Sequence, residues 1–224
     1  MKLLLVSATE FEILPIFNYL DQHFKLESKG CYIKEDLKVC ILITGVGMIE
    51  TSYHLTNSLN GDQYDLVVNL GIAGAFDKEI SLGSVFNIDS DYFGDLGVEE
   101  KDGTFTDLFE LGLLDTNHFP FSSKRIRNEL QEFSFLPNAS AVSVNKVHGN
   151  QKTIKAFKAK NDAMLETMEG AAFFYVCKMK DQQCLQIRSV SNHVTERSKG
   201  DWKIDLAIEN LGKVIVALLE TFMK

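Results

Sequence analysis

Short apolar segments of the strand type alternate with helical segments along the whole of this 224-residue sequence. The alternation contains no repeat and no linker, so it predicts a single α/β domain over residues 1–224, in which helices flank a mixed, mostly parallel central β-sheet. Strands are expected at residues 2–7, 31–35, 38–44, 66–70, 85–88, 141–146, 163–168 and 185–191, and helices at about 10–19, 48–59, 151–160, 169–180 and 202–222. Residues 93–140 contain several Gly and Pro residues and are expected to form loops, short helices and a surface that faces substrate or another subunit.

The charge balance of the chain argues against two classes of partner. The formal net charge is −8, and no run is rich in Lys or Arg. Nucleic acid and anionic membranes both require a positive surface, so neither is expected as a partner. No apolar run reaches the roughly 18 residues of a membrane span, and the first apolar run is too short for a signal peptide.

The cysteines indicate the expected cellular compartment. They lie at spacings that match no zinc or redox motif, at Cys31, Cys40, Cys177 and Cys184. Two of them fall in hydrophobic segments, so buried free thiols are expected, and the chain is expected in the reducing cytoplasm.

Two acidic residues are the candidate reactive groups. Glu12, flanked by Phe11 and Ile13, is the candidate general base, because a partly apolar setting raises the pKa of a carboxylate toward neutrality. The alternative is a solvated charge in a first helical turn, and the spacing alone favours it. Glu169 follows Met168 where a strand gives way to a helix, and a carboxylate there can accept two hydrogen bonds from a ribose diol. The alternatives are a helix N-terminal acid for Glu169 and a core position, rather than one under the sugar, for Met168.

A polar group ends the last expected strand. Asn192 offers a donor and an acceptor, which match O6 and a protonated N7 of a 6-oxopurine such as hypoxanthine; an aspartic acid would suit a 6-aminopurine better. Asparagine is also a common turn residue, and this alternative stays open. Arg188 and Ser191 are candidates to hold water or to support Glu12, and Arg188 could equally form a structural ion pair. Ligands of open α/β sheets bind beyond the carboxyl ends of strands, so these groups are expected to share a crevice with Glu169.

No cofactor or metal ion is expected. Gly45-Val46-Gly47 lacks the third glycine of a dinucleotide-binding loop, and the chain has no P-loop, HExxH or GxSxG motif. The histidines are scattered along the sequence.

Gly71-Ile72-Ala73-Gly74 follows a strand, so Ala73 and Gly74 could present backbone groups to a ligand, although this pattern alone is weak.

These pieces resemble the purine nucleoside phosphorylase/nucleosidase superfamily, specifically its hydrolase branch, over nearly the whole chain. The resemblance rests on residues 8–12, 44–47, 71–74, 167–172 and 188–192. It implies a nucleoside phosphorylase-like fold and a homodimer or larger homo-oligomer. In the related methylthioadenosine/S-adenosylhomocysteine nucleosidases, the acid at the position of Glu12 activates water and the acid at the position of Glu169 binds the ribose. In those enzymes an aspartate stands at the position of Asn192; this chain departs from the pattern there, which argues against adenine specificity.

The pattern is more similar to the futalosine hydrolase family of the alternative menaquinone pathway, which releases hypoxanthine from futalosine. That similarity adds Gly94–Glu99, Ser143–Val147 and the pair Arg197 and Trp202. It implies that Val147 contributes to the substrate pocket. It also implies that Arg197, or a residue of the 93–125 region, binds the carboxylate of the futalosine tail.

Three alternatives to a futalosine hydrolase stay open. The first is an adenine-releasing nucleosidase that acts on methylthioadenosine, S-adenosylhomocysteine or aminodeoxyfutalosine. The second is a phosphorylase, although residues 7–12 hold two acids and no Arg or Lys, and a carboxylate would repel phosphate. The third is a non-catalytic nucleoside-binding protein, which would not need a water-activating acid.

Overall fold

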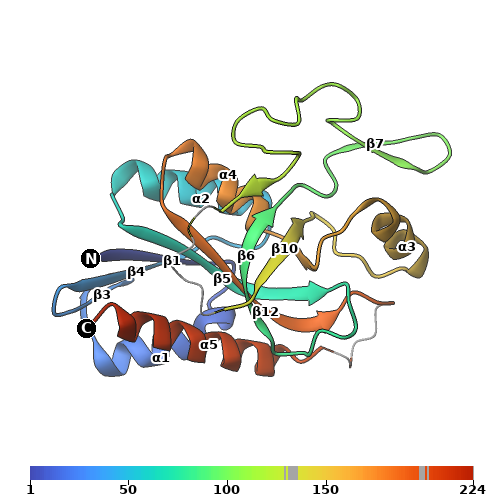
Figure 1. Cartoon of the computed structure of the whole chain (residues 1–224). Coiled ribbons are helices and arrows are strands. Elements are labelled where there is room, and N and C mark those ends of the chain that lie inside the picture. Colours follow the sequence, from blue (N-terminus) through green and yellow to red (C-terminus); the bar gives the residue numbers. More distant parts are fainter. Residues whose placement is uncertain (129, 131–135, 197–199, 201, 224) are drawn as a thin grey trace.

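A computed structural model describes residues 1–128, 130, 136–196, 200 and 202–223 (Figure 1). The strands are β1 (Lys2–Ser7), β2 (Lys25–Ser28), β3 (Cys31–Lys34), β4 (Leu37–Ile43), β5 (Leu66–Ala75), β6 (Val85–Asp91), β7 (Gly97–Glu99), β8 (Phe105–Asp107), β9 (Ile126–Arg127), β10 (Asn138–Ser143), β11 (Leu165–Thr167) and β12 (Cys184–His193). The helices are the 3-10 helix η1 (Phe11–Ile13), α1 (Leu14–His23), α2 (Met48–Gly61), α3 (Gln151–Lys160), α4 (Gly170–Met179) and α5 (Ile204–Thr221).

The main sheet is mixed and partly closed on itself. Its strands follow the order β11-β10-β6-β12-β5-β1-β4-β3-β2, with β9 on β6. The pairs β1–β4, β1–β5, β5–β12 and β6–β10 are parallel, whereas β6–β12 and β5–β11 are antiparallel. Because β5 pairs with both β12 and β11, the strands β5, β12, β6, β10 and β11 close into a ring. This arrangement confirms the expected α/β fold with a mixed central sheet.

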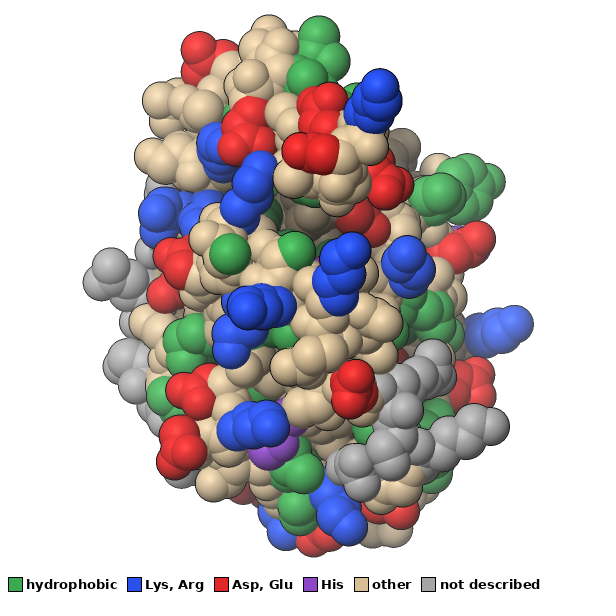
Figure 2. Space-filling model, turned by 90° about the vertical axis from the view of Figure 1, so that its right-hand side faces the viewer, with side chains coloured by type: hydrophobic (Ala, Val, Ile, Leu, Met, Phe, Trp, Pro, Cys, Tyr) green, Lys and Arg blue, Asp and Glu red, His purple; other side chains and the backbone are tan. Residues whose placement is uncertain are grey.

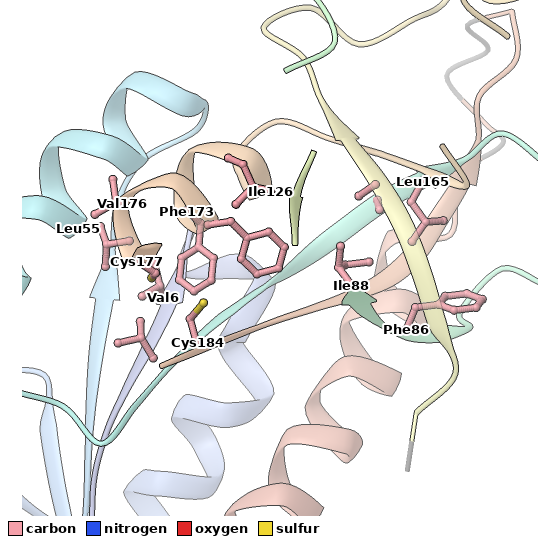
Figure 3. Close-up of a cluster of buried hydrophobic side chains, with 14 of the residues drawn as sticks. Val6, Leu55, Phe86, Ile88, Ile126, Leu165, Phe173, Val176, Cys177 and Cys184 are labelled. Atoms are coloured by element: carbon pink, nitrogen blue, oxygen red, sulfur yellow. The ribbon is translucent and has the colours of Figure 1, made fainter. Parts of the chain in front are cut away.

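Helices cover both faces of the sheet, and the strands bury side chains on both sides. Leu3 and Leu5 of β1 belong to the core under α1 and α5, whereas Leu4 and Val6 belong to the core under α2 and α4. Alternate residues of a strand point to opposite faces, which is why β1 is apolar throughout. Figure 3 shows Phe173 of α4 above the strands in the second of these cores.

Several expected boundaries differ from the structure. The helix expected from residue 10 is divided into η1 and α1, with Pro15 in the first turn of α1, where proline is tolerated. β5 continues through Ala75 instead of ending at residue 70, because it gains β11 and more of β12 as partners. α5 begins at Ile204 instead of residue 202, so Trp202 lies outside it and is exposed.

The expectation of free thiols is wrong for one pair. Cys31 and Cys40 form a disulfide, because the antiparallel register of β3 and β4 places them directly opposite each other. Cys177 and Cys184 are free and buried, as expected. Among the described residues, no helix is long and apolar enough to cross a membrane.

Candidate active site

The carboxylate of Glu12 is held by its own turn and by the central strand. Thr9 and Glu12 form the reciprocal contacts of a capping box: Thr9 N donates to Glu12 Oε2 over 3.1 Å, and Glu12 N donates to Thr9 Oγ1 over 3.3 Å. Thr9 Oγ1 and Ser7 Oγ also donate to Oε2, over 3.0 and 3.4 Å. The backbone N–H of Ile72 in β5 donates to the other oxygen, Oε1, over 3.1 Å. Glu12 is therefore a half-buried, oriented carboxylate and not a freely solvated charge.

Gly71 lets a second functional side chain approach Glu12. A Cβ atom on Gly71 would lie 2.9 Å from Glu12 Oε1 and would overlap Arg188 Nη1. Both side chains therefore reach the space above this glycine, and any larger residue would separate them. The arginine was a candidate to support Glu12, and the structure brings the two together.

Glu169 occupies the junction between β11 and α4. Its Oε1 accepts a hydrogen bond from the backbone N–H of Gly47 over 2.9 Å, and the residue is buried. Burial raises the pKa of Glu169 above its usual value, and the negative charge of Glu12 raises it further, while Arg188 and the Gly47 N–H oppose the shift. The two acids thus lie close enough to influence each other, with the guanidinium near both.

Arg188 is buried in the sheet, with 1% of its surface exposed. Its Nε donates to Gln186 Oε1 over 3.2 Å, and its Nη2 donates to Asn69 Oδ1. A buried cation needs such partners, because it has lost its hydration. These contacts orient the guanidinium between two amide oxygens.

Asn192 lies farther along the same pair of strands. A register shift between β12 and β5 leaves Ser191 unpaired and sets Asn192 opposite Gly74. Ser191 Oγ lies within hydrogen-bond distance of Asn192 Oδ1 (2.8 Å) and Ala73 O (3.3 Å), and Asn192 Nδ2 donates to His193 O over 3.2 Å. Gly71 and Gly74 are three residues apart on β5, or about 10 Å along the strand. Glu12 and Asn192 therefore approach β5 at points about 10 Å apart.

The remaining predicted residues are placed differently. Met168 is half-buried between β11 and Glu169, next to the acid as expected. Val147 packs against the small apolar core that includes Val144 and Phe157, after the end of β10. Arg197 lies outside the described residues.

Two buried acids were not predicted. Asp91 at the end of β6 accepts a hydrogen bond from Gln186 Nε2 over 3.2 Å. Glu166 of β11 pairs with His148, which contributes both its backbone N–H and its ring Nδ1. Polar residues inside otherwise apolar strands, such as Gln186 between Leu185 and Ile187, are the sequence signal for the first of these groups.

Among the described residues, no group of three or more His, Cys, Asp or Glu side chains could hold a metal ion. An open groove of about 470 Å³ lies along α2 and reaches α4, and it is lined by Met48, Ile49, Ser52, Tyr53, Thr56, Asn57, Phe93 and Ala172. A second cavity of about 270 Å³ includes Lys124, Arg125 and Asp107 in its lining.

The face that carries α3 displays Lys and Arg side chains among Asp and Glu side chains (Figure 2).

The sequence relatives of the chain define its enzyme class. The profile of the Phosphorylase superfamily matches residues 2–220, and the chain belongs to this family. It is 30% identical to the futalosine hydrolase of Streptomyces coelicolor over 155 residues, which are 69% of this chain and 65% of that protein. It is 22% identical to the 5'-methylthioadenosine/S-adenosylhomocysteine nucleosidase of Maridesulfovibrio salexigens, over 98% of this chain and 99% of that one. The chain therefore groups with the N-glycosyl hydrolases of the superfamily.

Solved structures agree with the fold. The futalosine hydrolase of Helicobacter pylori superimposes with a TM-score of 0.74 at 16% identity, over 99% of this chain and 98% of that one. A Helicobacter pylori nucleosidase variant with 5'-methylthioadenosine in its active site gives a TM-score of 0.75 at 15% identity, over 98% of each chain.

Proposed function

We propose that this enzyme hydrolyses the N-glycosidic bond of futalosine, releases hypoxanthine and leaves dehypoxanthine futalosine, as a step of the alternative menaquinone pathway. The observation that carries the proposal is a pair of held acids. Glu12 is oriented by Ile72 and Thr9, and Glu169 is held by the Gly47 N–H, with its pKa raised by burial and, to a smaller extent, by the charge of Glu12. A water-activating base and a diol acceptor are the two carboxylates that such a hydrolysis requires.

The reaction is a dissociative substitution at C1′ of the ribose. The bond to purine N9 lengthens and the sugar gains oxocarbenium character. Glu169 accepts hydrogen bonds from the ribose hydroxyls and so fixes the sugar. Glu12 takes a proton from the incoming water, whose oxygen then bonds to C1′. Arg188 supports the acid, and Ser191 instead holds the amide of Asn192.

Asn192 receives the leaving base. The purine leaves with the electron pair of the C1′–N9 bond and takes up a proton from solvent water at N7. The amide of Asn192 can donate to O6 and accept from that N7–H, so it stabilises hypoxanthine as the base departs. The amide lies half-buried over Gly74, where the absence of a side chain leaves the space that Asn192 Nδ2 and Val194 occupy. A 6-aminopurine presents a donor where hypoxanthine presents O6, which is why hypoxanthine is the favoured leaving group.

Water is favoured over phosphate as the nucleophile. The donors of the early loop, Thr9 N, Thr9 Oγ1 and Ser7 Oγ, already point to Glu12 Oε2. A phosphate dianion would have to compete for these donors and lie beside a carboxylate, and this repulsion grows as water is excluded.

The substrate tail and the quaternary structure extend the proposal. The carboxylate of the tail binds Arg197 or a residue of the 93–125 region. In that region, Lys124 and Arg125 line the second cavity but already form ion pairs with Asp107 and Asp162. We expect a cytoplasmic homodimer or larger homo-oligomer, and the apolar groove along α2 is the surface available for a partner copy.

A substrate panel tests the function. The purified protein is incubated with futalosine, inosine and methylthioadenosine, with and without phosphate, and the released base is identified by chromatography. Phosphate-independent release of hypoxanthine from futalosine, with little from inosine, is the expected result. Adenine release from methylthioadenosine would move the chain to the adenine-releasing nucleosidases that it also resembles. Binding without release would identify a nucleoside-binding protein.

A further inference from the structure

Asp91 is a fully buried acid that contacts none of the groups assigned to the reaction directly. It ends β6 with 0% of its surface exposed. Its Oδ1 accepts hydrogen bonds from Tyr92 N over 2.8 Å and from Ser143 Oγ over 3.1 Å, and its Oδ2 accepts one from Gln186 Nε2 over 3.2 Å. Its described hydrogen-bond partners are therefore all donors, which is the environment of an ionised carboxylate.

Gln186 connects this acid to Arg188. The amide is also fully buried, and it donates to Asp91 while its Oε1 accepts from Arg188 Nε over 3.2 Å. An ionised carboxylate only accepts hydrogen bonds and a guanidinium only donates them. The amide therefore has one orientation that satisfies both neighbours, and Asp91 determines it.

A second amide holds the other side of the guanidinium. Asn69 Oδ1 accepts from Arg188 Nη2, and Asn69 Nδ2 donates to Val6 O over 3.2 Å. Two amides thus clamp Nε and Nη2, each oriented by a partner at its far end. The remaining nitrogen, Nη1, lies at Gly71, beside Glu12 Oε1.

The Asp91–Gln186 pair is also packed against the helix that Glu169 opens. A Cβ atom on Gly170, the first residue of α4, would overlap both Gln186 Oε1 and Asp91 Oδ2. The pair consequently has little room to rearrange. The position of Gln186 Oε1, the acceptor for Arg188 Nε, is therefore fixed by Asp91.

We propose that Asp91 is a positioning residue, which acts through Gln186 to hold Arg188 against the water-activating acid Glu12. The inference rests on the proposed function, because it assigns a task to Arg188 within that reaction. Asp91 is fully buried among protein groups and acts on the reaction through Arg188, so its effect falls mainly on kcat, whereas the proposed contacts of the sugar and base with Glu169 and Asn192 determine KM.

The hydrogen-bond pattern predicts which substitutions break the chain from Asp91 through Gln186 to Arg188 and which restore it. In Asp91→Asn, the new amide has two orientations, and each makes two donors face each other. One places its NH₂ opposite Gln186 Nε2, and the other places its NH₂ opposite Tyr92 N. Rotation of Gln186 relieves the first conflict but turns its NH₂ toward Arg188 Nε. The double variant Asp91→Asn with Gln186→Glu restores every donor to an acceptor and keeps the net charge.

Protonation of Asp91 has the same consequence as its replacement. Burial raises the pKa of Asp91 to about 7, against the opposing effects of Gln186 and of the Arg188 guanidinium on β12. On the other sides the acid meets the uncharged Ser143 of β10 and the phenol-bearing Tyr92 of its own strand. A proton on Oδ2 would face Gln186 Nε2, so the anchor of Arg188 weakens as the pH falls through this range.

The experiment compares wild type, Asp91→Asn, the double variant and the control Asp89→Asn, which carries the same change on the same strand. Steady-state futalosine hydrolysis is measured across pH, together with the Nε–H resonance of Arg188 in arginine-labelled protein. The sequence holds arginines at 125, 127, 188 and 197, so the resonance is assigned by its loss in Arg188→Lys.

The expected result for Asp91→Asn is a loss of about 10- to 100-fold in kcat with a smaller change in KM, because a misplacement of about 1 Å has effects of this size. The Nε–H resonance of Arg188 shifts in this variant. In the double variant, both kcat and the resonance return toward their wild-type values. The acid limb of kcat in the double variant moves to lower pH, because its carboxylate contacts Arg188 directly. If Asp91→Asn fails to fold, recovery of fold and resonance in the double variant supports the proposal.

An Arg188 resonance and kcat that are unchanged in Asp91→Asn would overturn the proposal. A double variant no better than Asp91→Asn would also overturn it. A wild type that releases no base overturns the proposed function alone, since the resonance still decides whether Asp91 holds Arg188.

Discussion

Glu12 Oε1 and the backbone N–H of Ile72 are joined by a 3.1 Å hydrogen bond, although the residues are 60 positions apart. The bond ties the turn after β1 to the middle of β5, the strand that also carries Gly71 and Gly74. It leaves the second oxygen of Glu12 to the capping box with Thr9. The candidate base is thus oriented relative to β5, the strand that Asn192 also approaches, at Gly74.

Replacement of Glu169 by Gln tests the ribose contact. Gln retains an oxygen for the Gly47 N–H, so the fold is expected to survive, but it loses the charge that strengthens hydrogen bonds to the sugar hydroxyls. We expect kcat/KM for futalosine to fall by about 10- to 150-fold, the equivalent of about 1.5–3 kcal/mol. A 2′,3′-dideoxy substrate analogue should be equally poor for both proteins; equal rates of the two proteins with futalosine would exclude the contact.

Replacement of Asn192 by Asp tests the reading of the base. The carboxyl group removes the donor to O6 and supplies a group that can protonate N7, so preference should move toward 6-aminopurine nucleosides. The ratio of kcat/KM for aminodeoxyfutalosine to that for futalosine is expected to rise by about 10- to 100-fold, which corresponds to one or two hydrogen bonds. An unchanged ratio would remove Asn192 from base recognition.

The buried carboxyl of Asp91 predicts a pH dependence of stability. Its pKa is raised from 3.8 to about 7, so ionisation disfavours the folded state. The stability contributed by the neutral acid is fully present below the unfolded pKa and is lost as the pH rises through about 7. The free energy of unfolding in urea should be measured for wild type and Asp91→Asn at pH 5 and pH 8. From pH 5 to pH 8, the value for wild type should fall relative to that for Asp91→Asn, by up to a few kcal/mol. A constant difference between the two proteins would contradict the shift.

Gly170 is predicted to be intolerant of a side chain. In Gly170→Ala, the new Cβ would meet Gln186 Oε1 and Asp91 Oδ2, and neither can withdraw from its partners. We expect a loss of about 1–3 kcal/mol in unfolding free energy, the usual size of overpacking. Gly61→Ala is the control, because a Cβ there meets nothing within 4 Å. Similar melting temperatures for both variants would refute the close packing.

Local patterns in the sequence singled out Glu12 and Glu169 as candidates, and the structure places both beside strand ends. Their immediate neighbours left a solvated charge and a helix N-terminal acid open as alternatives, so the reactive roles also depend on the family resemblance. The alternation of strands and helices likewise predicted the α/β class, because apolar periodicity reflects burial directly.

Contacts that depend on strand register could not be predicted in the same way. Asp91 and Gln186 are 95 positions apart, and only the antiparallel pairing of β6 with β12 brings their strands together. The disulfide between Cys31 and Cys40 depends on the hairpin register for the same reason. A one-residue slip would turn each of these side chains to the other face of the sheet.

The most direct test of the account is hypoxanthine release from futalosine in phosphate-free buffer by wild type, Glu12→Gln and Glu10→Gln. Glu10 is exposed and two positions away, so its replacement controls for the loss of a charge in the same turn. We predict a fall in kcat of about 100- to 10,000-fold for Glu12→Gln, the usual contribution of a general base, with substrate binding still measurable. Undiminished turnover by Glu12→Gln would contradict the assignment of Glu12 as the residue that activates water.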